Sequence, residues 1–146
     1  MPTGGGGGGG GGKSIVNVLR GTGSGVDYST ASLAYVVVDA TNLSIALTVP
    51  ATQQIVIWAM GKFQNSTLND FTDVAIAKDA TPVSSNEGGG TTANSTTPGS
   101  ILHSEVGDGV SHTWALYFKA VVGGTAMLGN SSTSFRPVMV VAQFPI

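Results

Sequence analysis

The chain has 146 residues, no cysteine and a formal net charge of −2, with 41% hydrophobic and only 10% charged residues. This length allows one domain with an ordinary core, and the missing cysteines exclude disulfides, thiolate metal sites and cysteine nucleophiles. So few basic residues cannot form the positive surface that binds nucleic acid, and no apolar stretch approaches the roughly 20 residues of a membrane span. We therefore expect neither nucleic acid nor membrane among its partners.

Nine consecutive glycines, Gly4 to Gly12, are followed by Lys13 and Ser14. The run matches the phosphate-binding pattern G-x-x-x-x-G-K-[S/T], but an unbroken glycine run satisfies any glycine spacing. A phosphate loop also needs a strand before it and a helix after it, whereas Ser14–Arg20 is rich in β-branched residues and is expected to be a strand or an extended arm. We therefore expect no nucleotide site.

Residues 1–25 are predicted to form a glycine-rich N-terminal arm, with the glycines at 21, 23 and 25 as a hinge to a domain at 26–146. A glycine run is a flexible coil in water, because glycine loses the most backbone entropy on ordering. Two interpretations stay open: a linker, or an arm laid against other subunits, where missing side chains let backbones approach closely.

From Val26 onward, short β-type segments alternate with turn residues, which predicts an all-β domain. Gln54–Met60 is apolar on both faces and is expected to be a central strand covered on both sides, with a bend or bulge at Gly61. A hairpin turn is expected at Gly123–Gly124. The expected strands are Ser32–Val38, Leu43–Val49, Gln54–Met60, Asp73–Asp79, Ile101–Val106, His112–Val122, Thr125–Leu128 and Pro137–Phe144.

Thr81–Ser100 consists almost entirely of Thr, Ser, Asn, Gly and Pro and is predicted to be a long exposed loop. Asn86, Thr91 and Asn94 are its candidate contact residues. About eight strands with both long and short connections favour a jelly-roll-like antiparallel β-sandwich, although a barrel is not excluded.

The residues that could carry chemistry are few. His103 and His112 flank a Gly-Asp-Gly turn and, with Glu105 or Asp108, could ligate zinc, but solvent-exposed histidines are far more common than metal ligands. No nucleophile-elbow pattern with a following helix is present. We expect no enzymatic activity and no cofactor.

Two further kinds of site, for calcium and for sugars, are not expected. The three aspartates at 70, 73 and 79 lack the glycine-containing, oxygen-rich loop of a calcium site, so we expect solvated turn carboxylates. Trp58 and Trp114 are expected in the core of their strands, with Trp114, Leu116 and Phe118 on one face, rather than as sugar-stacking platforms.

The strand pattern is distinctive at five places: Leu47–Pro50, Val74–Asp79, Thr113–Lys119, Gly124–Ala126 and the final strand from Pro137. Together these segments resemble small jelly-roll domains of tailed-bacteriophage structural proteins, which are similar in architecture to the trimeric tumour-necrosis-factor and complement-C1q heads. The resemblance covers roughly Ala31 to Ile146 and rests on a pattern of strands.

The resemblance implies a homotrimer on a virion, made in the host cytoplasm. It implies a capsid decoration or cement protein that binds the major capsid protein or other virion proteins. The alternative is the receptor-binding tip of a tail or head fibre that contacts a host surface receptor. The oligoglycine arm and the 81–100 loop are not part of the general pattern and inherit no role from it.

Site residues follow from these hypotheses. The apolar terminal strand is expected in the trimer interface, with Val138, Val140, Phe144 and Ile146 as its contacts, unless it is simply the core of a monomer. The capsid-binding arm is expected to use Gly4, Gly8, Gly12, Lys13, Ile15 and Val16. The exposed loop would contact the host receptor in the fibre-tip alternative.

Overall fold

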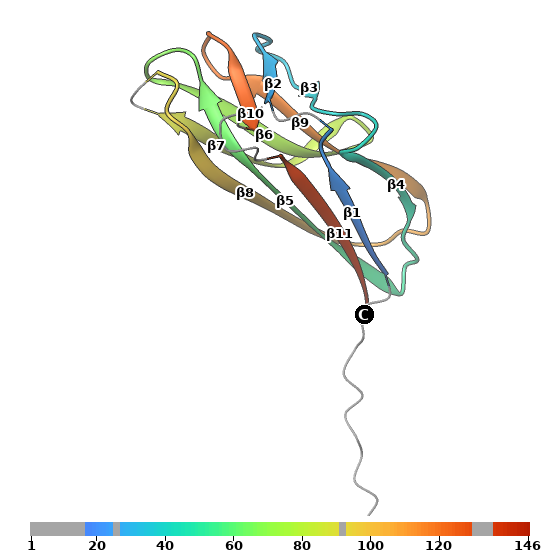
Figure 1. Cartoon of the computed structure of the whole chain (residues 1–146). Helices are drawn as coiled ribbons and strands as arrows, with labels where there is room; N and C mark the ends of the chain where they lie inside the picture. The colour runs from blue at the N-terminus through green and yellow to red at the C-terminus, as the bar shows by residue number, and fades with distance from the viewer. Residues whose placement is uncertain (1–16, 25–26, 91–92, 130–135) are drawn as a thin grey trace, which may run out of the picture.

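The computed structural model describes residues 17–24, 27–90, 93–129 and 136–146, which form β-strands and no helix (Figure 1). The all-β prediction is confirmed. No helix that could cross a membrane occurs in these ranges. The strands are β1 Asn17–Thr22, β2 Asp27–Thr30, β3 Val36–Val37, β4 Ser44–Thr48, β5 Gln53–Asn65, β6 Asp70–Lys78, β7 Thr81–Gly90, β8 Thr97–Val106, β9 Ser111–Ala120, β10 Ala126–Gly129 and β11 Val138–Pro145.

The first sheet, sheet A, is built around the 13-residue strand β5. One side of β5 pairs with β8, and the other side pairs first with β11 and then with β10. Strand β1 extends the sheet beyond β11, and β2 extends it beyond β10. Every pairing is antiparallel. Because β5 has partner strands on both sides, the prediction of a central strand at Gln54–Met60 is confirmed.

The second sheet, sheet B, has β9 and β6 at its centre. Strand β6 pairs with β7 on one side and β9 on the other, and the far side of β9 pairs with β3 and β4, all antiparallel. Several consecutive strands, from β4 to β6 and from β7 to β10, change sheet. Such crossings between two packed sheets are typical of a jelly-roll-like sandwich, which confirms the predicted fold class.

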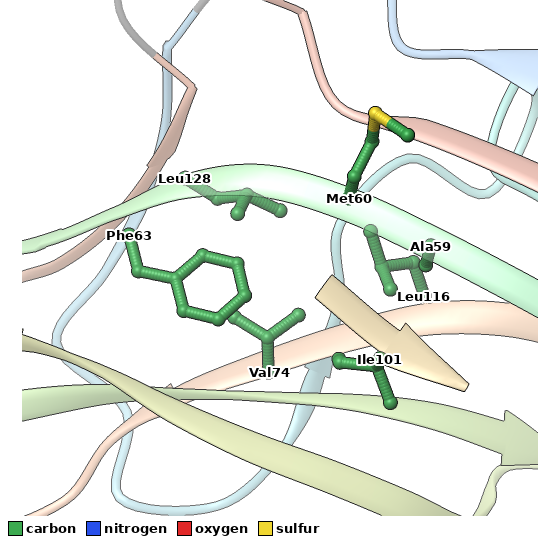
Figure 2. Close-up of a pocket in the computed structure, with 7 residues that line it drawn as sticks. All are labelled: Ala59, Met60, Phe63, Val74, Ile101, Leu116 and Leu128. Atoms are coloured by element: carbon green, nitrogen blue, oxygen red, sulfur yellow. The ribbon is translucent and has the colours of Figure 1, made fainter. Parts of the chain in front are cut away.

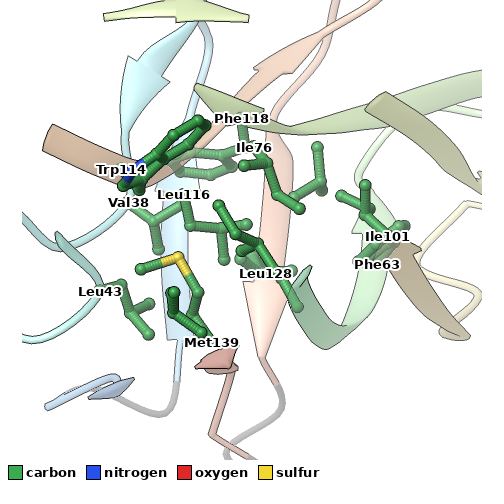
Figure 3. Close-up of a cluster of buried hydrophobic side chains, with 14 of the residues drawn as sticks. Val38, Leu43, Phe63, Ile76, Ile101, Trp114, Leu116, Phe118, Leu128 and Met139 are labelled. Carbon is green, nitrogen blue, oxygen red and sulfur yellow. The ribbon is translucent and has the colours of Figure 1, made fainter. Parts of the chain in front are cut away.

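The core lies between the sheets and comes from every second residue of the long strands. Six buried side chains at its middle leave no room for a water molecule: Ala59, Phe63, Val74, Ile101, Leu116 and Leu128 (Figure 2). Trp114, Leu116 and Phe118 of β9 share the inward face as predicted (Figure 3). Close packing of this kind makes large-to-small substitutions cost about 2–5 kcal/mol.

The prediction of a long loop at Thr81–Ser100 is wrong. Strand β7 pairs with β6 over its whole length, and β8 pairs with β5 from Thr97 onward. The polar, glycine-rich composition suggested a loop, but these segments are strands because backbone hydrogen bonds to β6 and β5, rather than apolar side chains, fix them. Their glycines also have a packing role: a Cβ on Gly88 or Gly99 would come within 2.6 Å of the buried Phe63 ring.

The expected hairpin at Gly123–Gly124 is also wrong, because β9 lies in sheet B and β10 in sheet A. The carboxylate of Asp70 turns the chain between them by accepting hydrogen bonds from the amides of Val122 and Gly123 at 2.9 and 2.8 Å. Gly124, at φ +67°, completes the crossing.

Three smaller expectations need correction. The strand expected at Ser32–Val38 is confined to Val36–Val37, because the Ser32 hydroxyl bonds the backbone of Ala34 on both its amide and its carbonyl and turns the chain. Strand β5 does not end or bulge at Gly61, which instead makes room for the Leu128 side chain. Gly21, expected in a hinge, is a buried residue of β1 packed against the Asn42 carbonyl.

The predicted arm residues Gly4, Gly8, Gly12, Lys13, Ile15 and Val16 lie outside the described residues. Within the range assigned to the arm, Asn17–Thr22 forms β1 and pairs with β11. Ser24 is also joined to the domain, because its amide and its hydroxyl both donate to the Asp39 carboxylate.

Candidate interaction face

The outward side of sheet A carries an apolar surface. On β5, Val56, Trp58 and Met60 alternate with the buried residues Ile55, Ile57 and Ala59, so they point away from the core. Trp58 is 46% exposed. The prediction that this strand is covered on both faces is therefore wrong, and so is the prediction that Trp58 lies in the core. We call this surface the outer face of sheet A.

Strand register extends this surface into continuous cross-strand rows. Trp58 lies between Val140 of β11 and Leu102 of β8, and Leu102 is 63% exposed. In the neighbouring rows, Met60 pairs with Val138, and Val56 with Ala142. The further apolar members are Val18 of β1, Val106 of β8 and Phe144 of β11. Apolar side chains thus line four neighbouring strands.

Among the outward-facing positions that the strand register gives, charged side chains occur only at the margin of this face. Arg20 lies on the edge strand β1 opposite Val140, and Lys62 lies towards the far end of β5 opposite Pro98. Beside Trp58 and Met60, an open hollow of about 310 Å³ is floored by Gly61 and Gly99 and bordered by Pro98 and Ser100. The face is therefore apolar at its centre and has a shallow hollow beside Trp58.

Three of the four predicted trimer-interface residues lie on this face. Val138, Val140 and Phe144 are half-buried and alternate with the buried Met139, Val141 and Gln143 of β11. Ile146 is an exposed residue just beyond the strand. The sequence prediction missed Trp58, Leu102 and Val106. The apolar character of both faces of Gln54–Met60 was a signal that could have found Trp58.

The predicted exposed-loop residues are dispersed. Asn86 is an exposed residue of β7, and its amide donates to the Ser100 carbonyl at 3.1 Å. Asn94, at φ +60°, lies in the turn before β8, and its backbone amide donates to the Asn65 carbonyl. Thr91 lies outside the described residues. Asn94 is thus a turn residue anchored to the end of β5.

The two histidines do not form a joint metal site. His103 contacts Glu105 at 3.3 Å, whereas His112 lies between Asp79 and Asp108, and both rings lie near Trp114. In the part of the chain that the structure describes, no group of three or more His, Asp and Glu side chains is arranged to hold a metal ion.

The three aspartates considered for calcium have separate structural partners. Asp70 is buried and bonds backbone amides, Asp73 accepts the Tyr35 hydroxyl, and Asp79 accepts the Thr113 amide. Burial would raise the pKa of Asp70, but the Val122, Phe71 and Gly123 amides together hold it below its usual range. The prediction of solvated carboxylates is therefore wrong for Asp70 and Asp73, which are both buried.

Comparison with known proteins identifies no family for this chain. No protein-family model matches the chain, and no curated protein matches it. One structural neighbour belongs to a crystal structure of the T13 IBDV viral particle, with a TM-score of 0.43 and 14% sequence identity. The match covers 89% of this chain and 35% of that one, so this chain spans about a third of its neighbour's length.

Proposed function

We propose that this chain is a non-enzymatic structural protein of a virus particle, a capsid decoration or cement protein that acts as a homotrimer. The observation that carries the proposal is the apolar outer face of sheet A. Monomeric soluble proteins rarely expose a contiguous apolar surface of more than a few hundred Å², and larger patches mark interaction sites. The resemblance of the strand pattern to trimeric jelly-roll domains supplies the identity of the partner, a second and third copy.

The chemistry of the face suits a protein partner. Interfaces of permanent oligomers are apolar at the centre and charged at the rim, and buried tryptophans contribute a large share of their binding energy. Trp58 occupies the centre here, with Leu102 of β8 beside it and Arg20 at the margin. A face of this kind favours association, because apolar side chains rather than charged ones occupy the centre of its described positions.

The arm is assigned the contact with the capsid. Its residues precede Asn17, which pairs with Gln143 at the edge of sheet A, close to the end of β11. Sixteen residues span up to about 50 Å when extended, enough to reach beyond a neighbouring subunit. Trimeric bodies with three such arms would bind a capsid lattice with high avidity.

A fibre-tip function is the second candidate. Its support is Asn94, an exposed residue in the turn before β8. Binding of the protein to intact host cells, abolished by shortening this turn while the trimer persists, would favour it over the cement function.

The test of the proposed interface is Leu102→Ser, with Leu68→Ser as its matched control. Leu102 is 63% exposed on the outer face of sheet A, and Leu68 is 57% exposed in the turn between β5 and β6. Light scattering should find a trimer for the wild type and for Leu68→Ser, and at least about tenfold weaker association for Leu102→Ser. A monomeric wild type, or equal weakening by both substitutions, contradicts the proposal.

A further inference from the structure

His112, near the start of β9, lies between two carboxylates that come from different turns. Its Nδ1 is 2.5 Å from Oδ2 of Asp79, in the turn between β6 and β7, and its Nε2 is 2.9 Å from Oδ2 of Asp108, in the β8–β9 loop. An ionised carboxylate only accepts hydrogen bonds, so both ring nitrogens must carry protons to make both bonds. An imidazole that is protonated twice is a cation.

Each carboxylate is itself fixed by the backbone. Oδ1 of Asp79 accepts the Thr113 amide, and Oδ1 of Asp108 accepts the Val110 amide, both at 2.9 Å. The Thr113 amide and His112 lower the pKa of Asp79, and His112 and the Val110 amide lower the pKa of Asp108. Hydrogen bonds from Asp79 and then Asp108 raise the pKa of His112 in return. The geometry therefore favours a cation between two anions.

The turn that His112 holds is strained. Asp79 and Ala80 have φ values of +49° and +65°, the left-handed region that residues with a Cβ rarely adopt. This conformation is unfavourable for such residues, so contacts from outside the turn must keep it in place. The bonds from His112 and Thr113 to the Asp79 side chain are such contacts.

Other charged groups at this end of the sandwich join the two sheets. Lys78 of β6 lies 2.8 Å from Oε1 of Glu105 on β8 and 3.9 Å from Asp108. His103 contacts Oε2 of Glu105 at 3.3 Å. Nζ of Lys78 also lies 5.2 Å from the centre of the Trp114 ring, and both histidine rings lie near the same tryptophan. The positive charge of Lys78 opposes protonation of His112 but acts less than the two aspartates.

We propose that doubly protonated His112 is a latch that ties the β6–β7 turn to the β8–β9 loop, and that loss of one ring proton opens this end of the sandwich. A neutral imidazole donates from one nitrogen alone, so one of the two carboxylates loses its partner. The latch is independent of the proposed virion function, since it lies among residues outside the apolar face.

The pH range in which the latch is closed follows from the directions of the three pKa shifts. The folded-state pKa of His112 is raised, so the stability from the latch is complete below the ordinary histidine value of about 6.5 and is lost as the pH rises through the folded value. The folded-state pKa values of Asp79 and Asp108 are lowered, so their contribution is present above about 4 and is lost as the pH falls through those values. The latch is closed between these limits.

The experiment is an NMR titration of the His112 ring in the full chain, with amide hydrogen exchange measured on the same samples. Wild-type His112 should titrate above about 6.5, and Asp79→Asn and Asp108→Asn should each lower the midpoint. Asparagine keeps an oxygen for the backbone amide and removes the charge. Protection factors correct the exchange rates for the intrinsic effect of pH. Those of the Thr113 and Val110 amides should fall about tenfold as the pH rises through the His112 midpoint.

Two variants make the result specific. His112→Gln should have low protection of these two amides at every pH, and His103→Gln should keep the wild-type profile. The Leu116 amide, in the middle of β9, reports global unfolding and should stay protected throughout. A His112 midpoint at or below about 6.5, or protection of Thr113 and Val110 that does not change across the titration, overturns the latch.

Discussion

Two glycines make room for one phenylalanine at the corner where the sheets meet. Phe63 of β5 is buried, and a Cβ on Gly88 of β7 or on Gly99 of β8 would come within 2.4 or 2.6 Å of its ring. The two glycines belong to different sheets, so the ring fills the space between the edge strands. A composition that suggests a loop is here a requirement of core packing.

Gly88→Ala should therefore destabilise the fold by about 1–3 kcal/mol, because the new methyl group must displace a rigid, enclosed ring. Gly123→Ala is the matched control, since a Cβ there meets nothing within 4 Å, and its effect should stay within about 0.5 kcal/mol. Urea denaturation of both variants measures the difference. Equal stability of the two variants would show that Phe63 can move aside.

Among the strands, the passage from β9 to β10 depends on one side chain. Asp70, the first residue of β6, accepts hydrogen bonds from its neighbour Phe71 and from Val122 and Gly123 beyond β9. These bonds give the amides of the connection an acceptor where the chain leaves sheet B and enters sheet A. A carboxylate far away in sequence thus decides a connection that the Gly-Gly pair alone suggests is a hairpin.

Asp70→Ala should cost about 2–4 kcal/mol, because three backbone amides lose their acceptor. Asp70→Asn, which keeps one acceptor oxygen, should cost less. Since the folded-state pKa of Asp70 is lowered, its contribution is complete above about 4 and disappears as the pH falls through the folded value. Thermal unfolding from pH 7 towards pH 2 should therefore show the wild type and Asp70→Ala converging, and a gap that persists in acid would contradict this role.

The whole molecule has two unlike faces. The outer face of sheet B carries Tyr35, whose hydroxyl donates to Asp73, with Lys119 4.7 Å from the centre of the Tyr35 ring. Burial, followed by the bond to Asp73, raises the pKa of Tyr35 to about 12. These three side chains contact one another, whereas the outer face of sheet A is apolar and open. The asymmetry favours association through one side of the sandwich.

Removal of residues 1–12 should leave the oligomer intact, because the apolar face lies wholly within the described strands. Light scattering of the full and truncated proteins should give about three times the 14.6 kDa chain mass for both, less the deleted residues. The truncated protein should bind purified particles more weakly. A truncated protein that is monomeric would move the source of the trimer from the face to the arm.

The sequence alone predicts the all-β class, most of the long strands and the inward face of β9, because a period of two between apolar residues is a local property. It also places Val138, Val140 and Phe144 on one side of the last strand, for the same reason. Three features depend on neighbours that are distant in the chain: the Ser- and Gly-rich strands β7 and β8, the crossing from β9 to β10, and the open face around Trp58. Tertiary structure decided these, since backbone pairing, a remote carboxylate and the absence of a covering layer leave no periodic signal in the sequence.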